Sequence, residues 1–384
     1  MKISIITGTR AEYGLLKNLM KKIKIDKNFK LLTIVTGMHL KKEFGLTYKS
    51  IEKDGFRINQ KVNIGLNGDT PHDILLSISK GFSGFSKAYI NLKPDLILVL
   101  GDRFELIPAA YSATIHRIPI CHIHGGEETY GVIDDPTRHV LTKLSQYHFV
   151  SNKVYKKRVV QMGEHPSRVF NVGGLGVDSI NNEKLANKSQ IEKKLKMRFL
   201  KKNILVTFHP LTLEKSTSQI YFSEILKSLS KLKDTRIIFT YPNADTNGRI
   251  IIKMINDYCK KNKNACKFKS LGQKYYYSIL NCIDLVLGNS SSGLLEVPTF
   301  KIPTVNIGDR QTNRLKATSV IDCNPKNIDI SKAISKAYSR KFQKKIIFTK
   351  NPYGKGGASD KIINILKNNK FAFKLKKKFY DLHK

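Results

Sequence analysis

The sequence predicts a two-domain α/β protein with two Rossmann-like, doubly wound parallel sheets and a cleft between the domains. Three observations support this prediction. Short apolar segments alternate with amphipathic ones, as in parallel strands that helices cover on both faces. The alternation restarts after about residue 180, and polar side chains stand directly after apolar segments in both halves. We expect an N-terminal domain over residues 1–180, a second domain over 181–361, and C-terminal helices over about 362–384 that pack back on the first.

The first half contains four segments with strand composition and three with helical periodicity. In the longest helical segment, the apolar residues recur at a spacing that puts them on one side: Ile74, Leu75, Ile78, Phe82, Phe85 and Tyr89. The expected strands are Lys2–Thr7, Phe29–Thr36, Leu96–Leu100 and Ile118–Ile123, and the expected helices are Tyr13–Ile25, Ile74–Leu92 and Phe104–Ile115.

The second half repeats the pattern after a polar, Lys-rich stretch, Asn181–Lys202, which we interpret as a linker plus a surface helix. Strands are expected at Ile204–Phe208, Arg236–Tyr241, Leu285–Leu287 and Thr304–Ile307. Helices are expected at Gln219–Leu232, Ile250–Lys261, Tyr275–Asn281 and Leu294–Phe300.

Composition narrows the class of protein. Hydrophobic residues make up 41 % of the 384 residues, which is typical of a globular chain. No apolar run approaches the ~18–20 residues of a membrane span. The N-terminal apolar segment reaches Gly8 and Arg10 too early for a secretory signal, so we expect a cytoplasmic protein. The five cysteines lack C-x-x-C spacing and are expected to be free thiols.

The formal net charge of +38 raises nucleic acid and anionic membranes as alternative partners. The lysines are spread along the chain, however, and no known nucleic-acid-binding motif is present. A membrane-surface helix over Lys370–Lys384 is a further alternative to packing on the first domain. We expect a small polyanion as ligand, with neither nucleic acid nor membrane as partner.

Ligands of open parallel sheets bind beyond the carboxyl ends of the strands. Arg10 follows the first strand and Asp102 and Arg103 follow Leu96–Leu100, offering guanidinium groups for phosphate and a carboxylate for acid–base chemistry. After Ile118–Ile123 comes an acidic and histidine-rich stretch with His124, Glu127, Asp134 and Arg138. Metal binding is one interpretation of this cluster, but the spacing matches no H-E-x-x-H helix, so we favour acid–base catalysis with no metal.

In the second half, His209 and Asn243 follow strands, and the segment Gly288–Gly293 precedes an expected helix. Its small residues let a ligand approach the backbone, and a helix N-terminus attracts a diphosphate. The segment is neither a Walker loop nor a dinucleotide fingerprint. Ser290 and Ser291 offer hydroxyls, Glu296 could accept from a ribose, and Arg310 and Arg314 follow the next strand.

Taken in order, these motifs resemble those of the hydrolysing UDP-N-acetylglucosamine 2-epimerases of sialic-acid biosynthesis, above all the bacterial capsule-pathway branch. The resemblance runs from Lys2 to about Tyr353. It is carried by the runs Gly8–Gly14, Thr36–His39, Gly101–Arg103, His122–Glu127, Gly288–Val297 and Asn306–Gln311.

The resemblance implies a GT-B-like fold and a reaction in which UDP-N-acetylglucosamine and water give N-acetylmannosamine and UDP. Elimination of UDP to a glycal precedes hydration with inversion at C2, and no cofactor takes part. By motif, Asp102, Glu127 and Asp134 become acid–base candidates, and His209 a group that assists the leaving nucleotide. The implied substrate-binding residues are Arg10, Arg103, His124, Arg138, His209, Asn243, Ser290, Ser291, Glu296 and Arg310.

Four alternatives stay open. His124 stands where relatives outside the capsule branch carry Glu, so either His124 or Glu127 could reprotonate the sugar. A sister enzyme, which acts on GDP-linked 2,4-diacetamido-trideoxyglucose on the way to legionaminic acid, matches almost as well. A GT-B glycosyltransferase would share the fold, and a non-enzymatic polyanion-binding protein would share the charge. We expect a homodimer or homotetramer with a UDP- or GDP-sugar as substrate.

Overall fold

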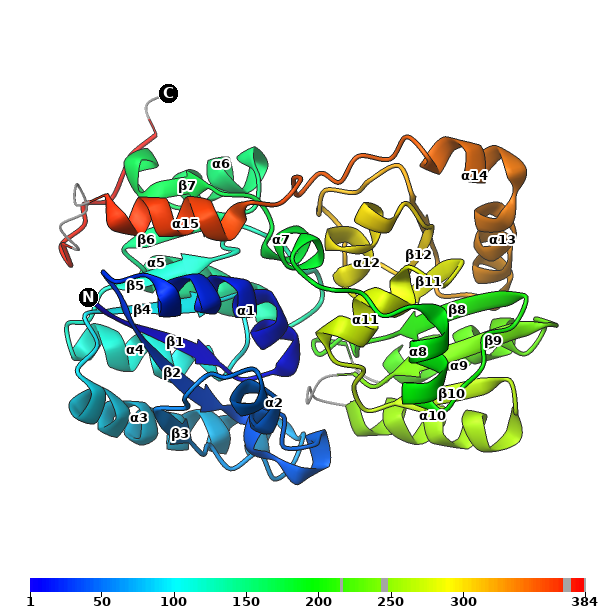
Figure 1. Cartoon of the computed structure of the whole chain (residues 1–384), viewed down its shortest axis with the longest axis horizontal. Helices are drawn as coiled ribbons and strands as arrows, with labels where there is room; N and C mark the ends of the chain where they lie inside the picture. The colour runs from blue at the N-terminus through cyan, green and yellow to red at the C-terminus, as the bar shows by residue number, and fades with distance from the viewer. Residues whose placement is uncertain (215–216, 243–247, 369–373, 383–384) are drawn as a thin grey trace. The chain divides into compact units, whose positions relative to one another are not determined.

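The chain folds into two structural units, each built on one parallel sheet (Figure 1). The computed structural model describes residues 1–214, 217–242, 248–368 and 374–382. Unit 1 comprises Met1–Glu127, Ile133–Asn182 and Tyr353–Lys384, and unit 2 comprises Glu128–Val132 and Glu183–Pro352.

The sheet of unit 1 has the strand order β3-β2-β1-β4-β5-β6-β7, with every neighbouring pair parallel. Its strands are β1 (Lys2–Thr7), β2 (Lys30–Thr36), β3 (Gln60–Val62), β4 (Leu96–Leu100), β5 (Ile120–Ile123), β6 (Tyr147–Val150) and β7 (Val169–Asn171). The helices are α1 (Arg10–Ile25), α2 (Tyr48–Lys53), α3 (Pro71–Leu92), α4 (Leu106–Ile115), α5 (Asp134–Leu144), α6 (Lys153–Gln161), α7 (Leu175–Asn181) and α15 (Ala358–Lys367).

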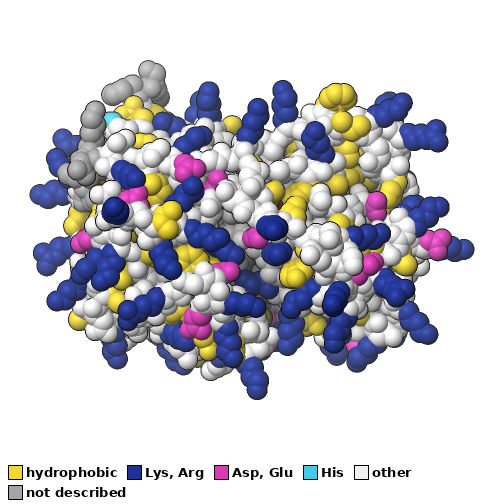
Figure 2. Space-filling view, in the orientation of Figure 1, with side chains coloured by type: hydrophobic (Ala, Val, Ile, Leu, Met, Phe, Trp, Pro, Cys, Tyr) yellow, Lys and Arg dark blue, Asp and Glu magenta, His cyan; other side chains and the backbone are white. Residues whose placement is uncertain are grey.

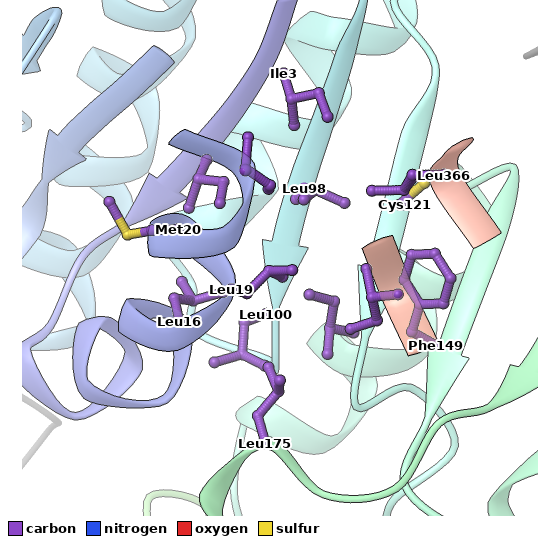
Figure 3. Close-up of a cluster of buried hydrophobic side chains, with 14 of the residues drawn as sticks. Ile3, Leu16, Leu19, Met20, Leu98, Leu100, Cys121, Phe149, Leu175 and Leu366 are labelled. Carbon is purple, nitrogen blue, oxygen red and sulfur yellow. The ribbon is translucent and has the colours of Figure 1, made fainter. Parts of the chain in front are cut away.

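Apolar side chains fill both faces of this sheet. On one face, α1 and α15 pack over the strands, with Leu16, Leu19 and Met20 of α1 and Leu366 of α15 in one buried cluster with Leu98 (Figure 3). On the other face, α3, α4 and α5 contribute the second cluster. A strand buried on both faces explains why β4 is a continuous apolar run in the sequence.

Unit 2 repeats this topology with the order β10-β9-β8-β11-β12-β13, again parallel throughout. Its strands are β8 (Lys202–Thr207), β9 (Thr235–Thr240), β10 (Ala265–Phe268), β11 (Leu285–Gly288), β12 (Thr304–Ile307) and β13 (Val320–Cys323). The helices are α8 (Lys188–Leu195), α9 (Thr217–Leu229), α10 (Gly248–Lys261), α11 (Gln273–Leu280), α12 (Ser292–Leu295), α13 (Asn327–Tyr338) and α14 (Arg340–Ile346). Two parallel α/β sheets confirm the predicted fold class.

The strand orders fix where each sheet can bind a ligand. In unit 1 the direction of chain progression reverses between β1 and β4, and in unit 2 it reverses between β8 and β11. Loops that leave neighbouring strands at such a switch point diverge to opposite faces and open a crevice beyond the strand ends. The residues after β1, β4, β8 and β11 are therefore the first candidates for a site.

Two predicted helices differ in the structure. The helix expected over Leu294–Phe300 is instead the four-residue α12 followed by a 3₁₀ turn, Val297–Phe300. Pro298 explains the break, because it lacks the N–H that an α-helix needs and its ring clashes with the preceding turn. Near the C-terminus, α15 ends at Lys367, and residues 374–382 form no helix.

Specific contacts hold the non-helical C-terminal segment to unit 1. Lys377 donates to the carbonyls of Lys143 and Ser145, both at 2.7 Å, and to Glu164 Oε1 at 2.8 Å. The Tyr380 N–H donates to the Gly163 carbonyl at 2.9 Å. The Tyr380 bond pairs a backbone N–H of the segment with unit 1, and the three Lys377 bonds tie its side chain to the same unit. The segment does pack back on the first unit, although not as a helix.

Positive charge is spread over the surface. Figure 2 shows Lys and Arg side chains scattered over the whole visible face, with few acidic ones among them. In the described part of the chain, no helix has the length and apolar character needed to cross a membrane.

Candidate active site

Arg10 is a cationic side chain in the loop region that follows β1. It is the first residue of α1, whose N-cap Thr9 forms a reciprocal capping box with Glu12. Within the described ranges, the Arg10 guanidinium has no hydrogen-bond or ion-pair partner, and burial lowers its pKa to about 10. Because burying an unpaired charge is costly, a half-buried arginine at a switch point is suited to an anionic ligand.

Asp102, in the loop after β4, is held by Arg138 of α5. The Arg138 guanidinium donates to Asp102 Oδ2, and only 4 % of its side chain is exposed. Asp134 is also buried and lies one helical turn before Arg138, so the two side chains leave the same face of α5. The structure thus joins Asp102 to Arg138 and turns the helix face with Asp134 toward the same loop.

His122, within β5, links the loop that carries Asp102 to the helix that carries Arg138. Its Nε2 lies 2.7 Å from the Gly101 carbonyl and its Nδ1 lies 3.1 Å from the Thr142 hydroxyl, which in turn lies 3.0 Å from the Arg138 carbonyl. Burial lowers the pKa of His122 to about 3, so the ring is neutral and can donate at one nitrogen while accepting at the other. His122 therefore connects the Asp102 loop to α5, as a structural histidine within the strand.

Arg103, in the loop after β4, is buried beside a carboxylate. It is 6 % exposed, and its Nε lies 3.5 Å from Glu105 Oε1. The interpretation of Arg103 as a direct nucleotide contact stays a prediction, since in this structure its guanidinium faces a buried carboxylate.

His124 and Glu127 form a buried pair after β5. His124 Nδ1 lies 3.1 Å from Glu127 Oε1, and the Ser151 hydroxyl donates to the same oxygen at 3.1 Å. The Leu175 N–H lies 3.4 Å from His124 Nε2. His124 has φ +65°, a conformation that is uncommon outside glycine and is found where surrounding structure enforces it.

These contacts concern the choice between His124 and Glu127 as the group that exchanges a proton with a ligand. Because the Leu175 N–H points at Nε2, that nitrogen acts as acceptor and Nδ1 carries the ring proton toward Glu127. Both ring nitrogens of His124 are thus engaged inside the protein, and so is Glu127 Oε1, so the choice between the two as the group that exchanges a proton with a ligand stays a prediction.

In unit 2, Asn289 joins the two loops at the switch point. Its Oδ1 accepts from the His209 N–H at 2.7 Å and its Nδ2 donates to the His209 carbonyl at 2.8 Å. Gly288 precedes it with φ +137°, and a Cβ there would collide with the Thr207 backbone. The paired amide places His209 beside the loop after β11, as the switch-point prediction requires.

Arg310 joins the same group. Arg310 Nη1 and Gln311 Nε2 donate to the Asn289 carbonyl at 3.3 and 2.9 Å. The Tyr130 N–H donates to the Arg310 carbonyl at 3.1 Å, and Arg314 Nη2 donates to Thr129 Oγ1 at 2.8 Å. The stretch Glu128–Val132 is thereby bound to the loop after β12 within unit 2.

Ser290, Ser291 and Glu296 lie next to this group. Ser290 and Ser291 follow Asn289 directly, and Glu296 accepts from the Tyr277 hydroxyl at 2.6 Å. The helix that follows these serines, α12, has only four residues, so the predicted helix length was wrong, and the attraction of a diphosphate to its N-terminus stays a prediction. Asn243 lies outside the described residues.

The sequence analysis named loops that the structure places after neighbouring strands, but it missed three side chains in them. It named the Gly288–Gly293 segment without seeing that Asn289 is its centre, and it passed over Gln311 and Glu105. A side-chain amide can pair with the N–H and C=O of one residue at once. An Asn directly after a strand-ending glycine was therefore the sequence signal that could have indicated the role of Asn289. Glu105 had no such signal, because its partners come from three separate strand ends.

Comparison with known proteins agrees with this geometry. The model of the UDP-N-acetylglucosamine 2-epimerase family matches residues 21–367, so the chain belongs to that family. It is accordingly an enzyme, a hydrolysing nucleotide-sugar 2-epimerase, which confirms the class expected from the motifs.

Three curated relatives resemble the chain over nearly its full length. A GDP/UDP-N,N'-diacetylbacillosamine 2-epimerase (hydrolyzing) from Campylobacter jejuni is 44 % identical, with 99 % of each chain covered. The polysialic acid biosynthesis protein P7 of Escherichia coli is 38 % identical over 99 % of this chain and 97 % of its own length. A UDP-N,N'-diacetylbacillosamine 2-epimerase (hydrolyzing) from Legionella pneumophila is 33 % identical over 95 % of both chains.

Solved structures confirm the GT-B-like fold. The UDP-GlcNAc 2-epimerase of Neisseria meningitidis bound to UDP-GlcNAc matches with a TM-score of 0.82 at 20 % identity, covering 95 % of this chain and 99 % of that one. The Methanocaldococcus jannaschii enzyme in complex with UDP-GlcNAc and UDP matches with a TM-score of 0.78 at 20 % identity and the same coverages.

Proposed function

We propose that this enzyme hydrolyses and epimerises a nucleotide-linked 2-acetamido hexose at C2, releasing the nucleoside diphosphate. The observation that carries this proposal is the chemistry of the loops that follow the strands of the two units. Unit 1 offers the carboxylates Asp102, Glu127 and Asp134, and unit 2 offers His209 and Arg310 around Asn289. Acids suited to a sugar and cations suited to a diphosphate are what elimination followed by hydration requires.

In the proposed reaction, a carboxylate removes the proton at C2 while the bond from C1 to the diphosphate oxygen breaks. The bonding pair leaves with the nucleoside diphosphate, and a 2-acetamido glycal remains. Water then adds its hydroxyl to C1, and a proton is delivered to C2 from the opposite side, which gives the manno configuration. We assign the proton transfers to Asp102, Asp134 and Glu127.

The second unit would stabilise the departing group. A developing diphosphate charge is best met by preorganised donors that need no rearrangement during the reaction. The Arg310 guanidinium is fixed to the Asn289 carbonyl, and His209 is fixed through its backbone to the same residue. Ser290 and Ser291 are the adjacent hydroxyls, and Asn243 stays among the proposed contacts on the sequence pattern alone.

Our first candidate substrate is a UDP- or GDP-linked 2,4-diacetamido-2,4,6-trideoxyglucose. It is supported by the 44 % and 33 % identical relatives, whose names give N,N'-diacetylbacillosamine. UDP-N-acetylglucosamine, with N-acetylmannosamine for sialic-acid synthesis as its product, is the second candidate. The 38 % identical polysialic acid protein supports it.

Separate incubations with the three nucleotide sugars decide between these candidates. Proton NMR should show free nucleotide and a manno-configured sugar in each productive tube. We expect kcat/KM to be highest for one of the two diacetamido sugars. A higher kcat/KM for UDP-N-acetylglucosamine would select the second candidate, and intact substrate in all three tubes would reject the proposed function.

Arg10→Gln tests the anionic ligand directly. Loss of a charge-assisted contact to a diphosphate should raise KM by about tenfold or more, which corresponds to roughly 1.4 kcal/mol or more. Because Arg10 has no protein partner in the described ranges, the melting temperature should change little. Initial rates and a thermal melt are the measurements. An unchanged KM would remove Arg10 from the site, and Arg57→Gln, remote from the strand-end loops in sequence, is the control.

A further inference from the structure

Two buried carboxylates lie behind the loop that carries Arg10, and the proposed reaction gives neither a part. Glu105 is fully buried at the start of α4, and Glu12 is 7 % exposed in the first turn of α1. Buried acidic side chains are rare unless they are paired. The contacts of Glu105 and Glu12 with the neighbouring loops therefore need a structural or functional explanation.

Glu105 touches the loops that follow three strands. Its Oε1 lies 3.5 Å from Arg103 Nε, in the loop after β4. A Cβ on Gly8, after β1, would come within 2.7 Å of Glu105 Cγ, and one on Gly37, after β2, would come within 3.2 Å of Oε1. The side chain thus fills the space between these loops, and only glycine fits at position 8.

Glu12 holds the same loop from the other side. Its Oε2 accepts from the N–H groups of Gly8 at 2.8 Å and Thr9 at 2.9 Å. Burial, and then the neighbouring charge of Glu105, raise the pKa of Glu12 to about 8. At neutral pH Glu12 is therefore mostly protonated, and Glu105 is the carboxylate that faces Arg103.

The charges around the two carboxylates balance in this state. Arg103 and Glu105 cancel, Glu12 is neutral, and burial lowers the pKa of nearby His39 to about 3, so His39 is neutral too. The net positive charge of this cluster of side chains is then that of Arg10. If Glu12 lost its proton, an uncompensated negative charge would stand behind the loop and oppose an anionic ligand.

We infer that Glu105 is a positioning residue, which together with Glu12 holds Arg103 and the Gly8–Arg10 loop in the conformation that binds the diphosphate-bearing substrate. This assignment rests on the proposed function, since it gives the loop a nucleotide sugar to bind. Glu105 acts through Arg103 and the Gly8 backbone, and it takes no proton from the substrate.

The test compares Glu105→Gln and Glu12→Gln with the wild type between pH 6 and 9, where Arg10 stays charged. The measurements are kcat and KM for the nucleotide sugar that the wild type turns over, calorimetric Kd values for UDP and GDP, and melting temperatures. Glu52→Gln on α2, whose side chain is 47 % exposed, is the matched control.

Glu105→Gln should raise KM and the nucleotide Kd about tenfold while kcat changes less than threefold. Wild-type KM should rise above about pH 8, as Glu12 loses its proton, and Glu12→Gln should remove that rise. Glutamine keeps the oxygen that accepts from Gly8 and Thr9, so this variant tests the inference even if Glu105→Gln fails to fold. An aspartate at position 105 keeps the charge and should recover part of the affinity.

Two failures can be told apart. An active wild type with unchanged KM in Glu105→Gln, or with the same pH dependence in Glu12→Gln, overturns the positioning role and leaves the proposed function standing. A wild type that turns over no nucleotide sugar rejects the proposed function, and the nucleotide Kd values then decide the positioning role. Unaltered Kd values in both variants overturn it, as does a wild type that binds neither nucleotide.

Discussion

Asp102→Asn should lower kcat by about a thousandfold, within the range of roughly 10²–10⁴ for loss of a general acid or base. Asparagine keeps the shape of the side chain and an oxygen that can accept from Arg138, but it cannot take up a proton. The variant should therefore fold and still bind nucleotide, because the proposed diphosphate contacts come from Arg10 and unit 2. Steady-state rates with calorimetric nucleotide binding measure both quantities.

The acidic pair on α5 supplies the matched control for this result. Asp134 is buried on the face that carries Arg138, whereas Asp135 is about one-third exposed and faces His139 at 3.6 Å. Asp134→Asn should cost a similar factor in kcat, and Asp135→Asn should stay within threefold of the wild type. Equal rates for the Asp102→Asn variant and the wild type would rule out Asp102 as an acid–base group.

Asn289→Ala should weaken nucleotide binding more than tenfold and destabilise unit 2 by about 2–4 kcal/mol. The substitution leaves the buried N–H and carbonyl of His209 without their partners, and each unsatisfied group costs roughly 1–3 kcal/mol. It also frees the loop after β11 that positions Ser290. Urea unfolding followed by a signal from unit 2 and calorimetric titration with nucleotide are the measurements.

Asn324→Ala provides the comparison for Asn289→Ala. Asn324 is exposed in the same unit, and its one side-chain bond among the described residues is to Asp329 at 3.2 Å. Its loss should therefore change stability by less than about 0.5 kcal/mol. Wild-type stability and nucleotide affinity in Asn289→Ala would mean that His209 is placed by other contacts.

The fold was predictable because both sheets are buried on two faces. β1, β4 and β12 fall on the predicted residues because segments rich in Ile, Leu and Val mark strands with helices on both sides. Short strands such as β3 and β7 were missed, since three residues at the edge of a sheet carry little periodicity. The broken helix after α12 was predictable from Pro298, and that signal was overlooked.

The site was predictable as loops but not as contacts. Position after a strand was enough to select Arg10, Asp102 and His209, because parallel strands end on one side of their sheet. It could not show that Arg138, which is 36 residues further along the chain, holds Asp102. Nor could it show that Arg103 faces Glu105, since the two-residue spacing does not by itself orient the side chains. Contacts between separate loops depend on the fold as a whole, which local patterns do not encode.

Turnover in deuterium oxide tests the central claim most directly, namely that carboxylates exchange the C2 proton while the diphosphate leaves. The wild type should release nucleoside diphosphate together with a manno-configured 2-acetamido sugar that carries one deuterium at C2. A released sugar that keeps its original hydrogen at C2, or that has the gluco configuration, would contradict the account.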